Sequence, residues 1–252
     1  MNPFDFNSEL YTAPDLAEGV DYARRHRRHE RLDDTLARTD DVPRTTVLAP
    51  HGGGIEPGTS ELCLAVAGYH PANLPRILPA GVTYDYWMFE GIRELGNAAL
   101  HVRSTGCDDG VAVSLCAGSL NALALHGFRP EPPDFSEDDQ VVLVGGGNTV
   151  LRGYLLEGLR DAGFDASDAG QHGELDGDAR CNIVNRTLLG MGAQLELSTP
   201  LRGAMFTEHS RPRRKHTTTE LFWVFAAVCR DALDRLEAEQ AVQRPGLRCL
   251  ER

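Results

Sequence analysis

A histidine and a glutamate stand five residues apart on a glycine-rich stretch of the chain, His51-Gly-Gly-Gly-Ile-Glu56. This spacing does not fit the helical H-E-x-x-H motif, in which the ligands lie on one helix face. On a curled loop, however, an imidazole and a carboxylate can converge on one metal ion. The loop therefore predicts two ligands of a metal site.

A third ligand and a catalytic base are predicted at the ends of other strands. Apolar runs at 45–50, 122–125 and 192–195 lead directly to His51, His126 and Glu196. In open α/β sheets the ligand site lies outside the carboxyl ends of the strands. Two histidines and Glu56 would leave one zinc position open for a water whose pKa falls to about 7, and Glu196 would act on that water as general acid/base.

The residue types alone leave other interpretations open for these side chains. A single histidine after a strand is more often a hydrogen-bonded core residue than a ligand, and this alternative stays open for His51 and for His126. Glu196 lies in Gln-Leu-Glu-Leu-Ser, where the polar face of an alternating strand is an equal explanation.

The elements that must position these residues are predicted from hydrophobic periodicity and from turn signals. The sequence predicts a single-domain α/β fold with a mixed, mostly parallel open sheet and helices on both faces. We treat 1–252 as one domain, with an N-terminal helical segment at 1–40 and a C-terminal tail at 240–252. The predicted strands are 45–50, 84–90, 100–104, 122–126, 141–144 and 194–197, and the predicted helices are 13–32, 60–68, 148–162, 180–189 and 218–239.

Composition excludes several classes of protein. The 252 residues are 41% hydrophobic and carry a net charge of −12, which disfavours general nucleic-acid binding. No apolar run reaches the roughly 18 residues of a membrane span, and the first residues lack a signal-peptide pattern, so we expect a soluble cytoplasmic protein that cell lysis could release.

The basic run 211–216 is interpreted as a solvated loop. Six scattered cysteines without a C-x-x-C pair predict free thiols.

Several segments, in order along the chain, resemble the phage-type poly-γ-glutamate hydrolase family. They are 51–61, 89–91, 97–105, 125–127, 144–146, 182–186, 192–197 and 201–202, and the resemblance spans roughly residues 10 to 235. It implies a zinc peptidase-like fold related to carboxypeptidase A and aspartoacylase, with one Zn²⁺. The resemblance puts the metal ligands at His51, Glu56 and His126 and the catalytic glutamate at Glu196. Arg103 stands where relatives often have a small polar residue, which leaves the substrate open.

Poly-γ-glutamate carries one free α-carboxylate per residue, so its binding site should contain cationic groups. Arginine binds carboxylates through two parallel hydrogen bonds. Arg103, Arg186 and Arg202 are the candidate substrate-binding arginines, and surface ion pairs are the alternative for each. Asn185 and His101 are further candidates.

Two other functions remain open at this stage. The same site could cleave small N-acyl amino acids, or the chain could be a non-enzymatic phage replication-associated binding protein. We expect neither a nucleic-acid nor a membrane partner, and we favour a monomer.

Overall fold

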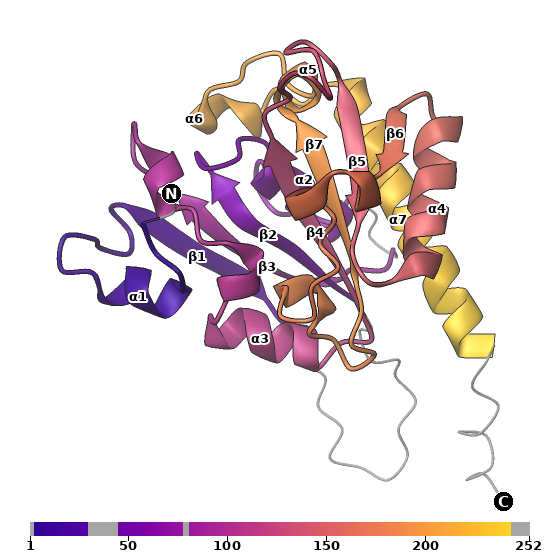
Figure 1. Ribbon diagram of the computed structural model, residues 1–252, viewed down its shortest axis with the longest axis horizontal. Helices are drawn as coiled ribbons and strands as arrows, with labels where there is room; N and C mark the ends of the chain where they lie inside the picture. Colours follow the sequence, from indigo (N-terminus) through magenta and orange to yellow (C-terminus); the bar gives the residue numbers. More distant parts are fainter. Residues whose placement is uncertain (1–2, 30–44, 78–80, 243–252) are drawn as a thin grey trace, which may run out of the picture.

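The computed structural model describes residues 3–29, 45–77 and 81–242 (Figure 1). One seven-stranded sheet has the strand order β1-β3-β2-β4-β7-β5-β6. Strands β3, β2, β4 and β7 run parallel, β1 is antiparallel to β3, and the parallel pair β5 and β6 is antiparallel to β7. The strands are β1 (Tyr22–Arg27), β2 (Thr45–Gly53), β3 (Asp85–Gly91), β4 (Asn121–Phe128), β5 (Val141–Gly145), β6 (Asp165–Asp168) and β7 (Ala193–Ser198).

Both faces of the sheet are covered by helices, as the sequence predicts. One face packs against α2 (Thr59–Val66), α4 (Thr149–Asp161) and α7 (Glu220–Val242), and Figure 1 shows α4 and α7 side by side. The other face packs against α3 (Gly110–Ala117) and the N-terminal helix α1 (Asn7–Thr12). The short helices α5 (Thr199–Ala204) and α6 (Arg211–Arg214) follow β7.

Alternate residues of the central strands enter two different hydrophobic clusters. In β2, Val47 and Ala49 face the α2 and α7 side, whereas Leu48 faces the α3 side together with Trp87 of β3. Because both faces are buried, these strands are continuous apolar runs instead of alternating ones. Among the described residues, no helix is long and apolar enough to cross a membrane.

A β-bulge in the central strand β2 determines where His51 points. Ala49 pairs with Met88 and Gly52 pairs with Glu90, so β2 has one extra residue between these two pairs. The extra residue reverses the alternation and places His51 on the face of Leu48, away from the α2 side that its sequence parity with Ala49 would give. Pro50 lies within this bulge, where its missing N–H is tolerated in an interior strand.

Three sequence predictions of secondary structure are wrong for the residues described. The predicted helix at 13–32 is absent from its described residues: 13–21 form turns, Tyr22–Arg27 form the edge strand β1, and residues 30–32 lie outside the described part. The charged side chains of β1 are typical of a sheet edge. The predicted strand at 100–104 joins two 3₁₀ turns (Asn97–Leu100 and Ser104–Gly106), and the predicted helix at 180–189 contains only the 3₁₀ turn Ile183–Asn185.

The other predicted elements agree with the structure within a few residues. The sequence did not predict α3, β6 or the short helices α5 and α6. The predicted C-terminal tail at 240–252 is helical at 240–242, which belong to α7, and its residues 243–252 lie outside the described part.

Candidate zinc site

A cavity of about 440 Å³ opens at the carboxyl ends of the parallel strands. Strand β2 contributes His51, β4 contributes His126 and β7 contributes Glu196, while Glu56 comes from the loop after β2. His101 also lines the cavity, whose remaining walls are formed by residues 103–105, 175–177, 179, 182 and 194. The structure therefore brings the predicted ligands and the predicted base into one cavity.

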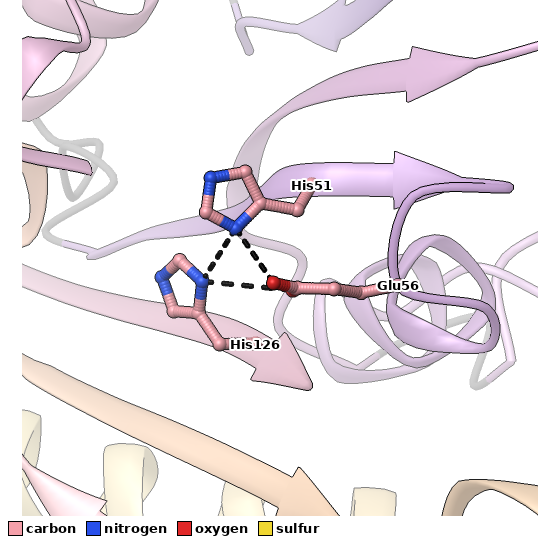
Figure 2. A group of neighbouring side chains, drawn as sticks. All are labelled: His51, Glu56 and His126. Atoms are coloured by element: carbon pink, nitrogen blue, oxygen red, sulfur yellow. Dashed lines mark hydrogen bonds and ion pairs between the residues drawn. The ribbon is translucent and has the colours of Figure 1, made fainter. Parts of the chain in front are cut away.

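The side chains of His51, Glu56 and His126 converge on one point, as Figure 2 shows. The two Nδ1 atoms of the histidines lie 3.1 Å apart, and His51 Nδ1 lies 2.9 Å from Glu56 Oε1. His126 Nδ1 lies 3.7 Å from Glu56 Oε2. On a tetrahedral zinc ion with Zn–N bonds of about 2.0–2.1 Å, ligand atoms are about 3.3 Å apart. The donor types and their separations fit zinc.

The partner on the far side of each imidazole ring supports this fit. His51 Nε2 lies 2.6 Å from the carbonyl oxygen of Val102, which can only accept a hydrogen bond. In the neutral ring Nε2 therefore carries the proton, and Nδ1 directs its lone pair at Glu56 and His126. His126 Nε2 lies 3.2 Å from Ser104 Oγ. Such outer partners orient the histidine ligands of metal sites.

Sequence analysis did not identify Val102 and Ser104 as part of the site. Both lie in the segment 101–106, whose first residues belong to the predicted strand at 100–104. As an irregular segment without strand neighbours, it offers its polar groups to the histidines across the cavity.

Glu56 is 9% exposed, and a backbone N–H next to His126, another proposed ligand, holds its carboxylate. Its Oε2 accepts a hydrogen bond of 2.8 Å from the N–H of Gly127, the residue after His126. Burial alone would raise the pKa of Glu56, but the neighbouring His51 and His126 outweigh this effect and hold the pKa below its usual range. The ionised carboxylate is the form that a metal binds.

Glu196 has the opposite electrostatic environment. It is 6% exposed, and its burial together with the charge of Glu56 raises the pKa of its carboxyl group well above the usual value. Gln194 Nε2 donates to Glu196 Oε1 at 3.0 Å, and Gln194 Oε1 accepts from Asn182 Nδ2 at 3.0 Å. The Gln194 and Asn182 amides therefore fix the Glu196 carboxyl group, which gives Gln194 a role that the sequence did not reveal.

His101 packs against the proposed metal ligand His51, with ring centroids 3.8 Å apart and the rings tilted by 33°. Its Nε2 lies 3.7 Å from Glu56 Oε1, and its Nδ1 has no hydrogen-bond partner among the described residues. Burial, together with the charge of His51, lowers the pKa of His101 to about 3. His101 is thus a neutral imidazole at the cavity wall, in contact with two proposed ligands.

The three candidate substrate arginines differ in position. Arg103 is exposed and lines the cavity, and its side chain makes no hydrogen bond or ion pair to any other described residue. Arg186 is also exposed, does not line the cavity, and donates to the carbonyl oxygen of Cys107 at 3.1 Å. Of the three, only Arg103 offers a free guanidinium group to a molecule in the cavity.

Arg202 and Asn185 are buried, and their polar groups already have protein partners. Arg202 donates to the carbonyl oxygens of Leu197 and Pro57 at 3.1 and 2.8 Å, and to Thr199 Oγ1 at 3.0 Å. Asn185 accepts from the N–H groups of 147 and 192 and donates to the carbonyl oxygens of 177 and 179. These contacts give no support to direct substrate binding by Arg202 or Asn185.

The cysteines agree with the expectation of free thiols as far as the structure describes them. Five are free, namely Cys63, Cys107, Cys116, Cys181 and Cys229, while residue 249 lies outside the described part.

Comparison with known proteins gives one family. A model of the poly-gamma-glutamate hydrolase family matches residues 24–228. The SPbeta prophage-derived protein YoqZ of Bacillus subtilis (strain 168) is 32% identical over 193 residues, which cover 77% of this chain and 63% of YoqZ. YndL of the same organism is 33% identical over 182 residues, which cover 72% of this chain and 64% of YndL. The chain therefore spans just under two thirds of the length of these relatives.

Two solved structures have the same fold over almost the whole chain. The structure of a bacteriophage poly-gamma-glutamate hydrolase matches with a TM-score of 0.76 and 27% identity, covering 94% of this chain and 99% of that one. A zinc-free form of YndL matches with a TM-score of 0.73 and 28% identity, covering 93% of this chain and 98% of that one. From the family match and these two structures, we conclude that the chain belongs to the poly-gamma-glutamate hydrolase family.

Proposed function

We propose that this chain is a zinc-dependent hydrolase that cleaves the γ-glutamyl amide bonds of poly-γ-glutamate. His51, Glu56 and His126 hold one zinc ion, and Glu196 is the general acid/base. Family membership supports the substrate, and the existence of a zinc-free form of the relative YndL supports the metal.

The convergence of lone pairs at the site carries the proposal. As a zinc ligand His51 would be neutral, and with its proton held on Nε2 by Val102 it would direct the Nδ1 lone pair toward Glu56 Oε1, 2.9 Å away. The Nδ1 atom of His126 approaches the same point. Lone pairs this close repel one another unless a proton or a metal ion lies between them, and three buried ligand atoms that converge in this way are typical of a metal site.

Zinc, when bound, supplies a Lewis acid that polarises an amide carbonyl and lowers the pKa of water. The chain's own contribution to proton transfer is Glu196. Because its pKa is raised, the ionised form of Glu196 is a stronger base than an ordinary carboxylate, so it can accept a proton from water and then pass that proton to the leaving nitrogen. Gln194 keeps the Glu196 carboxyl group in place during both transfers.

Arg103 is the group we propose for binding the substrate. Every residue of poly-γ-glutamate carries an α-carboxylate, and Arg103 offers an unpaired guanidinium at the cavity wall. His101, as a neutral imidazole beside the ligands, is proposed to contact the substrate next to the scissile amide. Arg186 is a more distant candidate for the same polymer. The cytoplasmic location, the monomeric state and the absence of a nucleic-acid partner remain predictions from the sequence.

A chain-length assay tests the proposal. Purified protein loaded with zinc should shorten poly-γ-glutamate, and a chelator or the variant His51→Ala should abolish this activity. A parallel assay with small N-acyl amino acids distinguishes the aspartoacylase-like alternative. If the zinc-loaded protein leaves the polymer unchanged but cleaves the small substrates, the proposed substrate is wrong. If it binds no stoichiometric zinc and cleaves neither, the binding-protein alternative is favoured.

A further inference from the structure

The basic segment at 211–216 contains one arginine that is not on the surface. Arg214 is 2% exposed, whereas its neighbour Arg213 is exposed and pairs with Glu208. Arg214 lies at the end of the short helix α6 and reaches Gly53, about 160 residues earlier in the chain, in the glycine-rich loop from His51 to Glu56 whose first residues are the end of β2. This loop carries two of the three proposed zinc ligands.

Three groups of Arg214 contact the protein around this loop. Nη2 donates to the carbonyl oxygen of Gly53 at 2.8 Å, and Nη1 donates to the carbonyl oxygen of His209 at 3.0 Å. Nε lies 3.3 Å from Oε1 of Glu61, which is 7% exposed. The other carboxylate oxygen of Glu61 is buried and has no hydrogen-bond partner among the described residues.

The backbone at Gly53 is held from both sides. Its φ of +67° lies in the left-handed region that favours glycine, and a Cβ at this position would lie 2.3 Å from the carbonyl oxygen of Gly91. The N–H of Gly53 donates to Ser60 Oγ at 2.9 Å, while its carbonyl accepts from Arg214. The N–H of Glu56 then closes the loop on the carbonyl of His51 at 2.8 Å. Arg214 therefore fixes one of the peptide groups that separate the two ligands.

Stability alone does not explain a buried pair of Arg214 and Glu61. Removing two charges from water costs several kcal/mol per ion, and apolar residues of similar volume often give an equally stable protein. What an apolar pair cannot supply is a donor for the Gly53 carbonyl. The contacts thus indicate a role in the conformation of the loop.

We propose that Arg214 is a positioning residue, which holds the loop so that His51 and Glu56 meet on the zinc ion. This inference rests on the proposed zinc site. It predicts that Arg214 determines zinc affinity without touching the metal or the substrate.

The experiment compares R214M with the double variant E61M/R214M. The single variant leaves a buried, unpaired Glu61 carboxylate and is expected to lower the thermal unfolding midpoint of the metal-free protein. The double variant removes both charges, so this midpoint should return close to that of the wild type. Its zinc dissociation constant, measured by competition with a chelator, should nevertheless rise about 10–100-fold, as for other groups that orient metal ligands. R213M is the matched control and should leave both quantities unchanged.

The outcomes separate the inference from the proposed function. If the folded double variant binds zinc within twofold of the wild type, Arg214 does not position the ligands. If the double variant does not fold, the zinc affinity of the variant R214K tests the inference instead. It keeps a charge beside Glu61 but lacks the guanidinium fork that contacts two carbonyls at once, so weaker zinc binding supports the role and unchanged binding overturns it. A wild-type chain that takes up no zinc contradicts the proposed function and this inference with it.

Discussion

His126 and Glu196 occupy opposite positions in the parallel register of β4 and β7. Partner residues in neighbouring strands point to the same face of a sheet, so a proposed zinc ligand and the proposed general base project side by side into the cavity. The two side chains have different neighbours, however. His126 lies among the converging ligand atoms, whereas the carboxyl group of Glu196 is fixed by the Gln194 amide.

Glu196→Gln should retain zinc and lose turnover. The amide has the shape of a protonated carboxyl group but cannot accept a proton, and removing a general acid/base typically lowers kcat by about 10²–10⁴-fold. Zinc content and kcat on poly-γ-glutamate are the measurements. Glu157→Gln, at an exposed residue paired with Arg235, is the control. Loss of zinc from the Glu196 variant would mean that Glu196 is a metal ligand.

His126→Ala should remove stoichiometric zinc from the purified protein, because it deletes one of three buried donors. Metal analysis after dialysis against a weak chelator measures this directly. His26→Ala changes an exposed histidine of β1 and should keep the metal content of the wild type. A His126 variant that keeps one tightly bound zinc per chain would contradict the proposed ligand set.

Arg103→Met should weaken substrate binding with little effect on zinc. A hydrogen bond to a charged group contributes about 1.5–3 kcal/mol, so KM for poly-γ-glutamate should rise about 10–100-fold. The control is Arg129→Met, at a side chain that is 72% exposed and lies outside the cavity. An unchanged KM for the Arg103 variant would exclude it from carboxylate binding.

The metal-free protein should show a pH dependence that arises from Glu196. Its pKa is raised in the folded state, so the folded chain holds a proton that the unfolded chain releases above about pH 4.5. The stability from this proton is complete below that pH and is lost as the pH rises. The Glu196→Gln variant lacks this titration. The difference between its free energy of unfolding and that of the wild type should therefore increase as the pH rises from 4.5 towards 8. Urea unfolding of both proteins in the presence of a chelator measures the difference.

A contribution from His101 should cancel in this comparison. Its pKa is lowered to about 3, so acidification below about pH 6.5 destabilises both proteins by the same effect. A constant difference between the two proteins over the whole range would show that the pKa of Glu196 is not raised.

Arg202→Met should destabilise the fold. It removes a donor from the buried carbonyl oxygen of Leu197, at a cost of about 1–3 kcal/mol, and from the partly buried carbonyl oxygen of Pro57, at a smaller cost. Urea unfolding of the metal-free variant measures the loss, and Arg235→Met at an exposed ion pair serves as the comparison. A stable Arg202 variant with a higher KM would instead support the sequence-based assignment of Arg202 to substrate binding.

The sequence by itself determined the fold class, and together with the family resemblance it predicted the set of proposed zinc ligands. Apolar runs that are buried on both faces predicted a largely parallel sheet between helices, because only such a sheet hides both sides of its strands. The strands that lead to His51 and His126 indicated two candidate ligands, since parallel strands share one carboxyl edge. These signals are local, so they can be read along the chain.

Only the tertiary structure decided which way the ligands point and what holds them. The bulge at Pro50 reverses the alternation of β2, and without it His51 would face α2 instead of His126. The sequence contained a signal of this bulge, namely a proline in an interior strand, but the strand's position in the sheet had to be known first. Arg214 was interpreted as part of a solvated basic run because charge runs usually are, and its burial against Gly53 depends on a contact between distant parts of the chain. Long-range packing decides such contacts, and periodicity along the chain does not encode them.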